Sequence, residues 1–244
     1  MTPRGTTQRI VAMGGGGFSM EPDNPLLDDF LLSLVAGRRR PRVCFLPTAA
    51  GDAADYVVRF YQAFTRRECV PTHLGLFRRT VSDLDALFAE QDLVYVGGGN
   101  VVNLLAVWRA HGVDQALRRA LERGTVLCGL SAGSLCWYEG GTTDSLGPGL
   151  NPLRDGLGWL AGSHSPHYDG EPGRRPLYQR LVQEGALPPG LAADDGVALL
   201  YEDGVLVRTV SSRPEAKAWR VEPGAAEARE TAIEPELLGG PDRR

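Results

Sequence analysis

The chain has 244 residues, of which 43% are hydrophobic and 23% are charged, and its formal net charge at pH 7 is −4. This balance is ordinary for a globular protein and excludes a disordered or collagen-like chain, and the lack of a basic excess argues against a nucleic-acid partner. The sequence holds no apolar run near the roughly 20 residues that span a bilayer and no signal-peptide core, so we expect a cytoplasmic protein without a membrane partner.

Short apolar runs typical of β-strands alternate with helix-like segments through the first two-thirds of the chain. Such alternation predicts βαβ units and a parallel sheet. The first helix is expected to start at Asn24-Pro25, because an asparagine side chain can cap the first turn and proline fits there. The expected strands are 9–13, 42–47, 92–96 and 125–130, and the expected helices are 24–37, 53–68, 101–110 and 113–123.

In the last third of the chain, strands follow one another without helices between them. The strands expected there are 197–201, 205–210 and 216–221. Because Glu202-Asp203-Gly204 forms a turn sequence between the first two, they predict a β-hairpin and a mixed sheet edge. Residues 225–244 are rich in proline, glycine and charge, and they predict a loosely ordered tail. No linker or internal repeat divides the sequence, so we expect a single domain over residues 1–244.

A run of four glycines, Gly14 to Gly17, follows the first expected strand. A dinucleotide-binding turn would need glycine or alanine where this chain has Ser19, so the spacing fits that motif poorly. We interpret the run as a loop that lines a site and can touch substrate. A nucleotide-binding protein stays a remote alternative.

A second glycine loop, Gly97-Gly98-Gly99-Asn100, follows the expected strand 92–96 and precedes a helix. Its backbone N–H groups are expected at the carboxyl edge of the sheet, where they could stabilise the oxyanion that forms in acyl transfer. Gly98 and Gly99 are the candidate donors from this loop. The alternative is a glycine loop needed only for close packing or for phosphate binding.

The sequence Gly129-Leu-Ser-Ala-Gly133 follows the apolar strand 125–130. This Gly-x-Ser-x-Gly pattern predicts a sharp strand-to-helix turn that exposes Ser131 as a nucleophile, and the N–H of Ala132 would be a second oxyanion donor. Residues 134–138 are expected to continue as a buried helical segment. The alternative is an ordinary βα turn in which Ser131 only caps the helix.

Histidine is scarce, so the choice of a general base is narrow. The four histidines are His73, His111, His164 and His167. His164-Ser165-Pro166-His167 is expected in a loop of small residues, where Pro166 would stiffen the backbone beside the candidate base His167. A His-x-x-His metal site is the competing interpretation, but no convincing third ligand accompanies it.

A histidine base needs a third group to orient it. The carboxylates of Asp144, Asp169 and Asp195 are all plausible by chain position, and spacing alone does not choose among them.

The four cysteines form no Cys-x-x-Cys pair. We expect all of them to be reduced and structural; they are Cys44, Cys69, Cys128 and Cys136.

Taken together, the motifs resemble those of the peptidase E (aspartyl dipeptidase) family of serine peptidases over residues 9–210. The matching segments are Gly-Gly-Gly-Asn at 97–100, Gly-Leu-Ser-Ala-Gly-Ser at 129–134, Thr-Thr-Asp at 142–144, Pro-His-Tyr at 166–168 and Gly-Glu at 170–171 followed by Arg174-Arg175. The resemblance implies a three-layer αβα fold with a mostly parallel sheet, similar to class I glutamine amidotransferases, with serine in place of their nucleophilic cysteine. It also implies hydrolysis of dipeptides that carry an N-terminal aspartate.

The resemblance also implies roles for individual residues. Ser131 would be the nucleophile and His167 the base, with Gly98, Gly99 and Ala132 as the oxyanion hole and no cofactor or metal. An arginine shortly after the histidine would hold the aspartate side chain of the substrate, and Arg175, or else Arg174, matches it. Related cyanophycinase-like peptidases take the third triad residue from an Asp-Glu pair where this chain has Asp194-Asp195, so Asp195 is preferred to Asp144.

The leading hypothesis is therefore a serine dipeptidase acting on Asp-Xaa, with a small peptide as its partner and a monomeric or homodimeric state. A cyanophycinase-like peptidase that cleaves β-aspartyl peptides is the second hypothesis. A ligand-binding protein of the same fold without turnover is the third.

Overall fold

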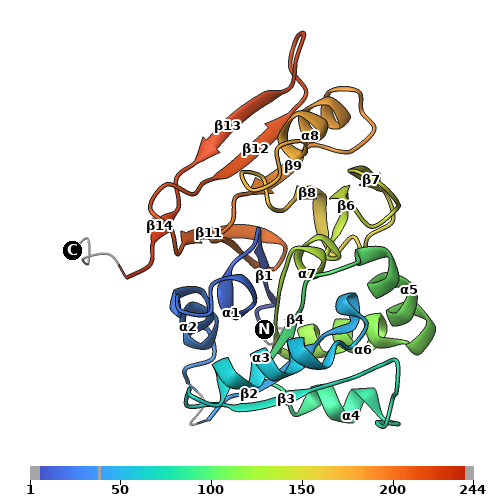
Figure 1. Cartoon of the computed structure of the whole chain (residues 1–244), viewed down its shortest axis with the longest axis vertical. Helices are drawn as coiled ribbons and strands as arrows, with labels where there is room; N and C mark the ends of the chain where they lie inside the picture. Colours follow the sequence, from blue (N-terminus) through green and yellow to red (C-terminus); the bar gives the residue numbers. More distant parts are fainter. Residues whose placement is uncertain (1–5, 38–39, 240–244) are drawn as a thin grey trace, which may run out of the picture.

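The computed structural model describes residues 6–37 and 40–239, whose strands form a sheet of eight strands and a sheet of six (Figure 1). The eight-stranded sheet has the order β14 (Glu236–Leu237), β11 (Val205–Ser211), β10 (Val197–Glu202), β1 (Arg9–Met13), β5 (Val126–Leu130), β4 (Leu93–Val96), β2 (Arg42–Leu46) and β3 (Val70–His73). The pairs from β1 to β3 are all parallel, whereas β10 runs antiparallel to both β1 and β11. The predicted parallel sheet and hairpin are confirmed.

Helices cover both faces of this sheet. Along β1, Ile10 and Ala12 face one hydrophobic core while Val11 and Met13 face another, as the two-residue period of a strand requires. The second core is shared with α1 (Gly17–Met20), α2 (Leu26–Ser33) and α3 (Ala54–Phe64). The first is shared with α4 (Leu84–Ala89), α5 (Val101–His111) and α6 (Val113–Arg123). The predicted three-layer αβα arrangement is confirmed.

The six-stranded sheet was not predicted from the sequence, apart from the strand expected at 216–221. Its order is β13 (Arg229–Ile233), β12 (Ala218–Glu222), β9 (Gly190–Ala193), β8 (Leu160–Ser165), β6 (Tyr138–Thr143) and β7 (Asn151–Leu153). Helix α8 (Arg174–Gln183) packs Tyr178, Leu181 and Val182 into a core with Ala192 and Val221 of this sheet. Figure 1 shows α8 beside β12 and β13 at the upper end of the molecule.

The prediction of a loosely ordered tail over 225–244 is wrong for the part that the structure describes. Residues up to 239 include β13 and β14, and β13 pairs antiparallel with β12. Glu230 of β13 accepts hydrogen bonds from Tyr168 and from Gln179 of α8, which fixes the strand against the helix. Residues 240–244 lie outside the described residues.

Two further local expectations need correction. The helix after Ser131, α7, spans only Ala132–Leu135, and Tyr138 already opens β6 instead of continuing that helix. His164 lies in β8 and not in a loop, and its side chain is fully buried. Both errors come from Gly-rich or polar strands that lack an alternating hydrophobic pattern.

The carboxyl ends of β1, β4 and β5 meet at one edge of the eight-stranded sheet, as parallel strands require. The glycine run 14–17, the glycine loop 97–99 and Ser131 follow these three strand ends directly. Because β10 is antiparallel to β1 and pairs Ala198 with Met13, the chain that enters β10 lies at the same edge. Segments far apart in the sequence therefore converge here.

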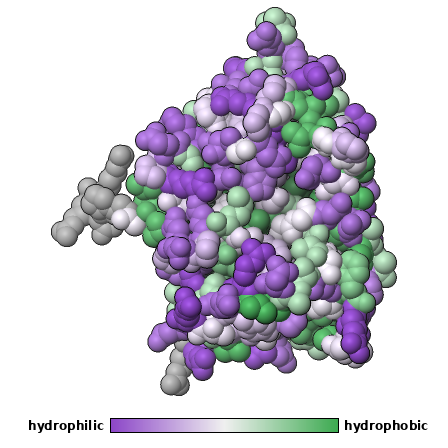
Figure 2. Space-filling model, viewed as in Figure 1, coloured by the Kyte–Doolittle hydropathy of each residue, from purple (hydrophilic) through white to green (hydrophobic). Residues whose placement is uncertain are grey.

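No helix among the described residues has the length and apolar character needed to cross a membrane. On the face shown in Figure 2, hydrophilic and hydrophobic side chains are interspersed.

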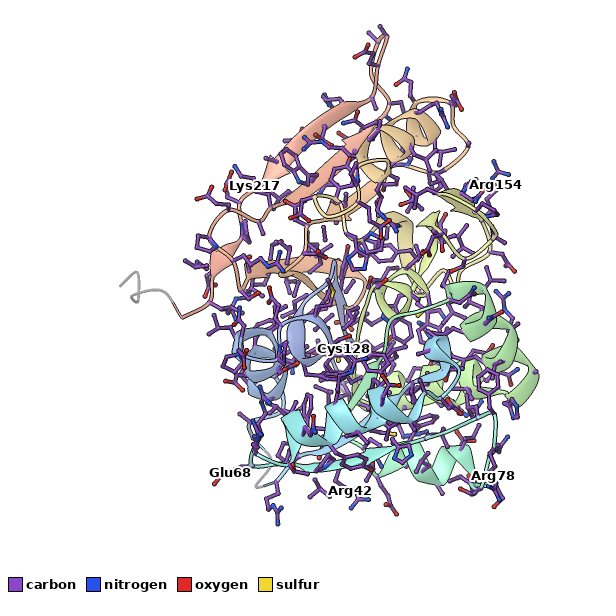
Figure 3. The ribbon with its side chains drawn as sticks, viewed as in Figure 1. Arg42, Glu68, Arg78, Cys128, Arg154 and Lys217 are labelled. Carbon is purple, nitrogen blue, oxygen red and sulfur yellow. The ribbon has the colours of Figure 1, made fainter. Side chains whose placement is uncertain are left out.

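All four cysteines are buried and free. Cys128 lies at the centre of the molecule, whereas Arg42 and Arg154 lie at its periphery (Figure 3).

Candidate active site

Ser131 occupies a sharp turn between β5 and α7. Its backbone has φ 54° and ψ −118°, a conformation that non-glycine residues rarely adopt and that is typical of a nucleophile elbow. The flanking glycines allow the turn, because a Cβ at Gly129 would overlap the Gly133 carbonyl and a Cβ at Gly133 would overlap the Val96 carbonyl. The Gly-x-Ser-x-Gly spacing is therefore a steric requirement of this turn.

His167 and Asp195 lie in contact at the same sheet edge. The Nδ1 atom of His167 is 2.6 Å from Oδ1 of Asp195, and both side chains are largely buried. His167 also has a positive φ of 52°, which is uncommon outside glycine and occurs often at functional sites. Among the described residues, no hydrogen bond joins the Ser131 hydroxyl to His167, whose Nδ1 contacts Asp195.

The pKa of Asp195 is lowered. Burial raises the pKa of this carboxyl, but the hydrogen bond from His167 and the electrostatic interactions with His167, Arg213 and Arg174 outweigh that effect. Asp169 supports the arrangement from behind, because its Oδ1 accepts the backbone N–H of Asp195 at 2.8 Å. The carboxylate beside His167 is thus held in its charged form.

Asp144 and Asp194, two further acids considered from the sequence, lie in different environments. Asp144 is exposed just after the end of β6, and within the described residues it forms no hydrogen bond with His167. Asp194 accepts the backbone N–H of Lys217 at 2.9 Å and the indole N–H of Trp219 at 3.2 Å. Of the candidate acids, the geometry brings Asp195 to the histidine.

The candidate oxyanion donors differ in their availability. The N–H of Gly98 donates to the Tyr56 hydroxyl at 3.1 Å, although Gly98 lies close to Ser131. The N–H groups of Gly99 and Ala132 donate to no partner within the described part of the chain. Tyr56 was not anticipated, because it comes from α3 and no local motif marks it.

The two candidate arginines at the start of α8 point to different surroundings. Arg174 is buried and donates from Nη1 to the Thr142 carbonyl at 2.8 Å and from Nη2 to Glu171 at 2.7 Å. Arg175 is partly exposed; it pairs with Glu230 of β13, and its guanidinium lies 4.2 Å from the ring centroid of Trp219. Arg174 therefore belongs to the interior beside β6, and Arg175 to the face of β12 and β13 that α8 covers.

His164 is buried and makes contacts with neighbouring strands of the protein interior. Its Nδ1 donates to the Leu191 carbonyl at 2.9 Å, and its ring stacks on Tyr138 at a centroid distance of 4.6 Å. Burial lowers the pKa of His164 to about 3, so the ring stays neutral. His164 and His167 thus face different partners despite their spacing in sequence.

Comparison with known proteins places this geometry in context. Residues 10–208 match Peptidase family S51. "Uncharacterized peptidase YgaJ" of Bacillus subtilis (strain 168) is 51% identical over 232 residues, which cover 95% of this chain and 100% of that protein. "Peptidase E" of Streptomyces coelicolor is 31% identical over 177 residues, covering 70% of this chain and 69% of that protein.

Two solved structures share the fold. The crystal structure of a peptidase from an acI-B1 Actinobacterium has a TM-score of 0.70 at 19% identity and covers 98% of each chain. The crystal structure of a putative peptidase E protein from Listeria monocytogenes EGD-e has a TM-score of 0.59 at 16% identity, covering 94% of this chain and 100% of that one.

Proposed function

Because the chain belongs to peptidase family S51, we propose that it is a serine-type dipeptidase that cleaves dipeptides with an N-terminal aspartate, Asp-Xaa. The observation that carries the proposal is the convergence of Ser131, on its strained elbow, with the His167–Asp195 pair at one sheet edge. The relative named Peptidase E supports the same class of activity.

The geometry suggests an acyl-enzyme mechanism. Asp195 accepts the Nδ1–H of His167, which leaves Nε2 to take the proton from the Ser131 hydroxyl as its oxygen attacks the peptide carbonyl. The N–H groups of Gly99 and Ala132 would hold the developing oxyanion. His167 then protonates the leaving amine, and water, activated by His167 in turn, releases aspartate from Ser131.

We assign the aspartate side chain of the substrate to Arg174 in preference to Arg175. Arg174 is buried beside the end of β6, where it donates to the Thr142 carbonyl, and its charge contributes, after that of Arg213, to lowering the pKa of Asp195. A guanidinium shielded from water attracts a carboxylate more strongly than an exposed one does. Arg175 is instead held over β12 and β13 by Glu230 and Trp219.

A peptide panel tests both the reaction and the arginine. Purified protein should cleave Asp-Ala and discriminate strongly against Asn-Ala, since a charge-assisted contact contributes about 1.5–3 kcal/mol, or roughly 10–100-fold. Arg174→Met should abolish this Asp/Asn discrimination, while the neighbouring control Arg175→Met should preserve it. The ratio is measured within each variant as kcat/KM, so a general loss of activity does not affect the comparison.

The outcomes separate the alternatives. Cleavage of β-linked Asp-Ala in preference to the α-linked peptide would replace the proposed specificity with a β-aspartyl one. Loss of discrimination in Arg175→Met alone would move the carboxylate site to Arg175. No cleavage of any aspartyl peptide would contradict the proposal.

A further inference from the structure

The last residue of β1 and the first two glycines after it are bonded to the backbone of all three proposed triad segments. The Met13 carbonyl accepts the N–H of Ser131 at 3.3 Å, and the Gly14 carbonyl accepts the N–H of His167 at 3.3 Å. The Gly15 carbonyl accepts the N–H of Gly196, the residue after Asp195, at 3.1 Å. Three consecutive carbonyls thus fix the relative positions of nucleophile, base and acid.

Gly15 also packs directly against the two side chains that form the His–Asp contact. A Cβ at this position would overlap Oδ1 of Asp195 and would lie 2.9 Å from both Nδ1 and Cε1 of His167. Real Cβ atoms do not approach other heavy atoms this closely. Because Gly15 has no Cβ, the imidazole of His167 and the carboxylate of Asp195 can lie directly against its Cα.

A nucleotide-binding role does not account for these contacts. The helix that follows the run, α1, has four residues, too short for the dipole-assisted phosphate site of a dinucleotide-binding turn. The three carbonyls at positions 13, 14 and 15 already accept hydrogen bonds from the backbone N–H groups of Ser131, His167 and Gly196. The run is built around the triad segments.

We propose that Gly15 is a positioning residue of the serine peptidase, required so that His167 Nδ1 and Asp195 Oδ1 can meet at 2.6 Å. This inference rests on the proposed function for its catalytic consequence. A methyl group at residue 15 must displace the ring or the carboxylate, and a misplacement of about 1 Å in a catalytic group costs on the order of 100-fold in rate. The loss should appear in kcat more than in KM, because Gly15 touches the triad side chains.

The test compares Gly15→Ala with the control Gly37→Ala. Among the described residues, no atom lies within 4 Å of a Cβ built on Gly37, so that substitution should be neutral. Gly15→Ala should lower kcat on Asp-Ala by about 100-fold. It should also shift or abolish the low-field proton NMR signal of the hydrogen-bonded His167 Nδ1–H, identified by its loss in His167→Gln, whereas Gly37→Ala should keep both.

A second pair of variants covers the case in which Gly15→Ala folds poorly. Asp195→Ala removes the atom with the worst overlap, so Gly15→Ala should lower the melting temperature less in that background than in the wild-type protein. Equal losses in the two backgrounds, or an unchanged proton signal with unchanged kcat, would overturn the inference. If the signal responds as expected but wild-type protein cleaves no aspartyl peptide, the proposed function fails while the positioning role stands.

Discussion

At Ser131 a strained backbone and a short sequence motif explain each other. A non-glycine residue at φ 54° and ψ −118° costs of order 1–3 kcal/mol, which the surrounding structure must offset. Gly129 and Gly133 reduce that cost by allowing the backbone of the turn to pack against itself and against β4. Ser131 could be predicted from the sequence because the glycines that permit the turn lie within the same five-residue segment, 129–133.

The acid could not be assigned from local sequence, because its contact joins residues 28 positions apart. Asp144, Asp169 and Asp195 all stand near turns, and it is the β1–β10 pairing that brings Asp195 to His167. Gly98 illustrates the same limit, since its N–H is taken by Tyr56, 42 residues away in sequence. Contacts of this kind depend on the whole sheet, which no motif encodes.

Asp195 should be required for fast turnover, because it orients His167. Asp195→Asn keeps the shape of the side chain but lets His167 adopt the wrong tautomer, and the equivalent change in a serine-peptidase triad costs roughly 10⁴-fold in kcat. Asp144→Asn is the matched control and should change kcat by less than about twofold, because Asp144 is exposed and, within the described residues, forms no hydrogen bond with His167 or Asp195.

Steady-state kinetics on Asp-Ala measure both variants. Because the pKa of Asp195 is lowered, this carboxylate stays charged as the pH falls into the ordinary aspartate range. The contribution of its charge to kcat/KM should therefore persist there. A large loss in Asp144→Asn with an active Asp195→Asn would assign the acid to Asp144.

At the scale of elements, four parallel strands (β1, β2, β4 and β5) and four helices (α2, α3, α5 and α6) were predicted from the sequence, whereas β3, α1, α4 and most of the second sheet were not. Strands β1, β2, β4 and β5 are continuous apolar runs, typical of strands buried on both faces. By contrast β6 reads Tyr-Glu-Gly-Gly-Thr-Thr and β8 reads Leu-Ala-Gly-Ser-His-Ser. Those glycines are required by close packing, since a Cβ at Gly141 would overlap the His164 carbonyl, yet they hide the strand pattern.

The packing of α2 on the sheet carries a buried carboxyl. Asp28 is 1% exposed, its Oδ1 has no hydrogen-bond partner in the described residues, and its Oδ2 lies 3.5 Å from Arg67. Burial raises the pKa of Asp28 to about 7, against the opposing effects of Arg67 and the backbone N–H of Phe18. The folded state therefore favours the protonated carboxyl.

This predicts a pH-dependent stability that Asp28→Asn removes. Because the folded pKa is raised, the contribution of the protonated carboxyl is complete below the unfolded value near 3.8 and is lost as the pH rises through about 7. The full loss is about 4 kcal/mol at most. Asparagine stays neutral, so Asp28→Asn should raise the melting temperature more at pH 8 than at pH 5, where only the smaller part of the contribution has been lost.

Thermal unfolding at the two pH values makes the measurement. Asp29→Asn is the control, since Asp29 is the exposed neighbour on the same helix and also contacts Arg67. A melting-temperature shift of equal size at pH 5 and pH 8 in Asp28→Asn would show that the carboxyl is not protonated in the folded protein.

For the whole molecule, the family resemblance read from the sequence is confirmed by the match to Peptidase family S51 over residues 10–208. The structure shows that the candidate site depends on both sheets. Ser131 follows β5 of the eight-stranded sheet, His167 follows β8 of the six-stranded sheet, and Asp195 lies in the connection from β9 to β10 between them. The three residues thus reach one another only when the two sheets are docked through the end of β1.

The central claim is that Ser131 becomes acylated by an aspartyl substrate, and mass spectrometry tests it directly. Protein quenched during turnover of a slowly hydrolysed aspartyl ester should carry one added aspartyl group, located on Ser131 by peptide mapping. The adduct should be absent in Ser131→Ala and present in Ser33→Ala, which removes a serine hydroxyl that donates to the Phe30 carbonyl of α2. Peptide hydrolysis that continues in Ser131→Ala, or an adduct on another residue, would contradict the account.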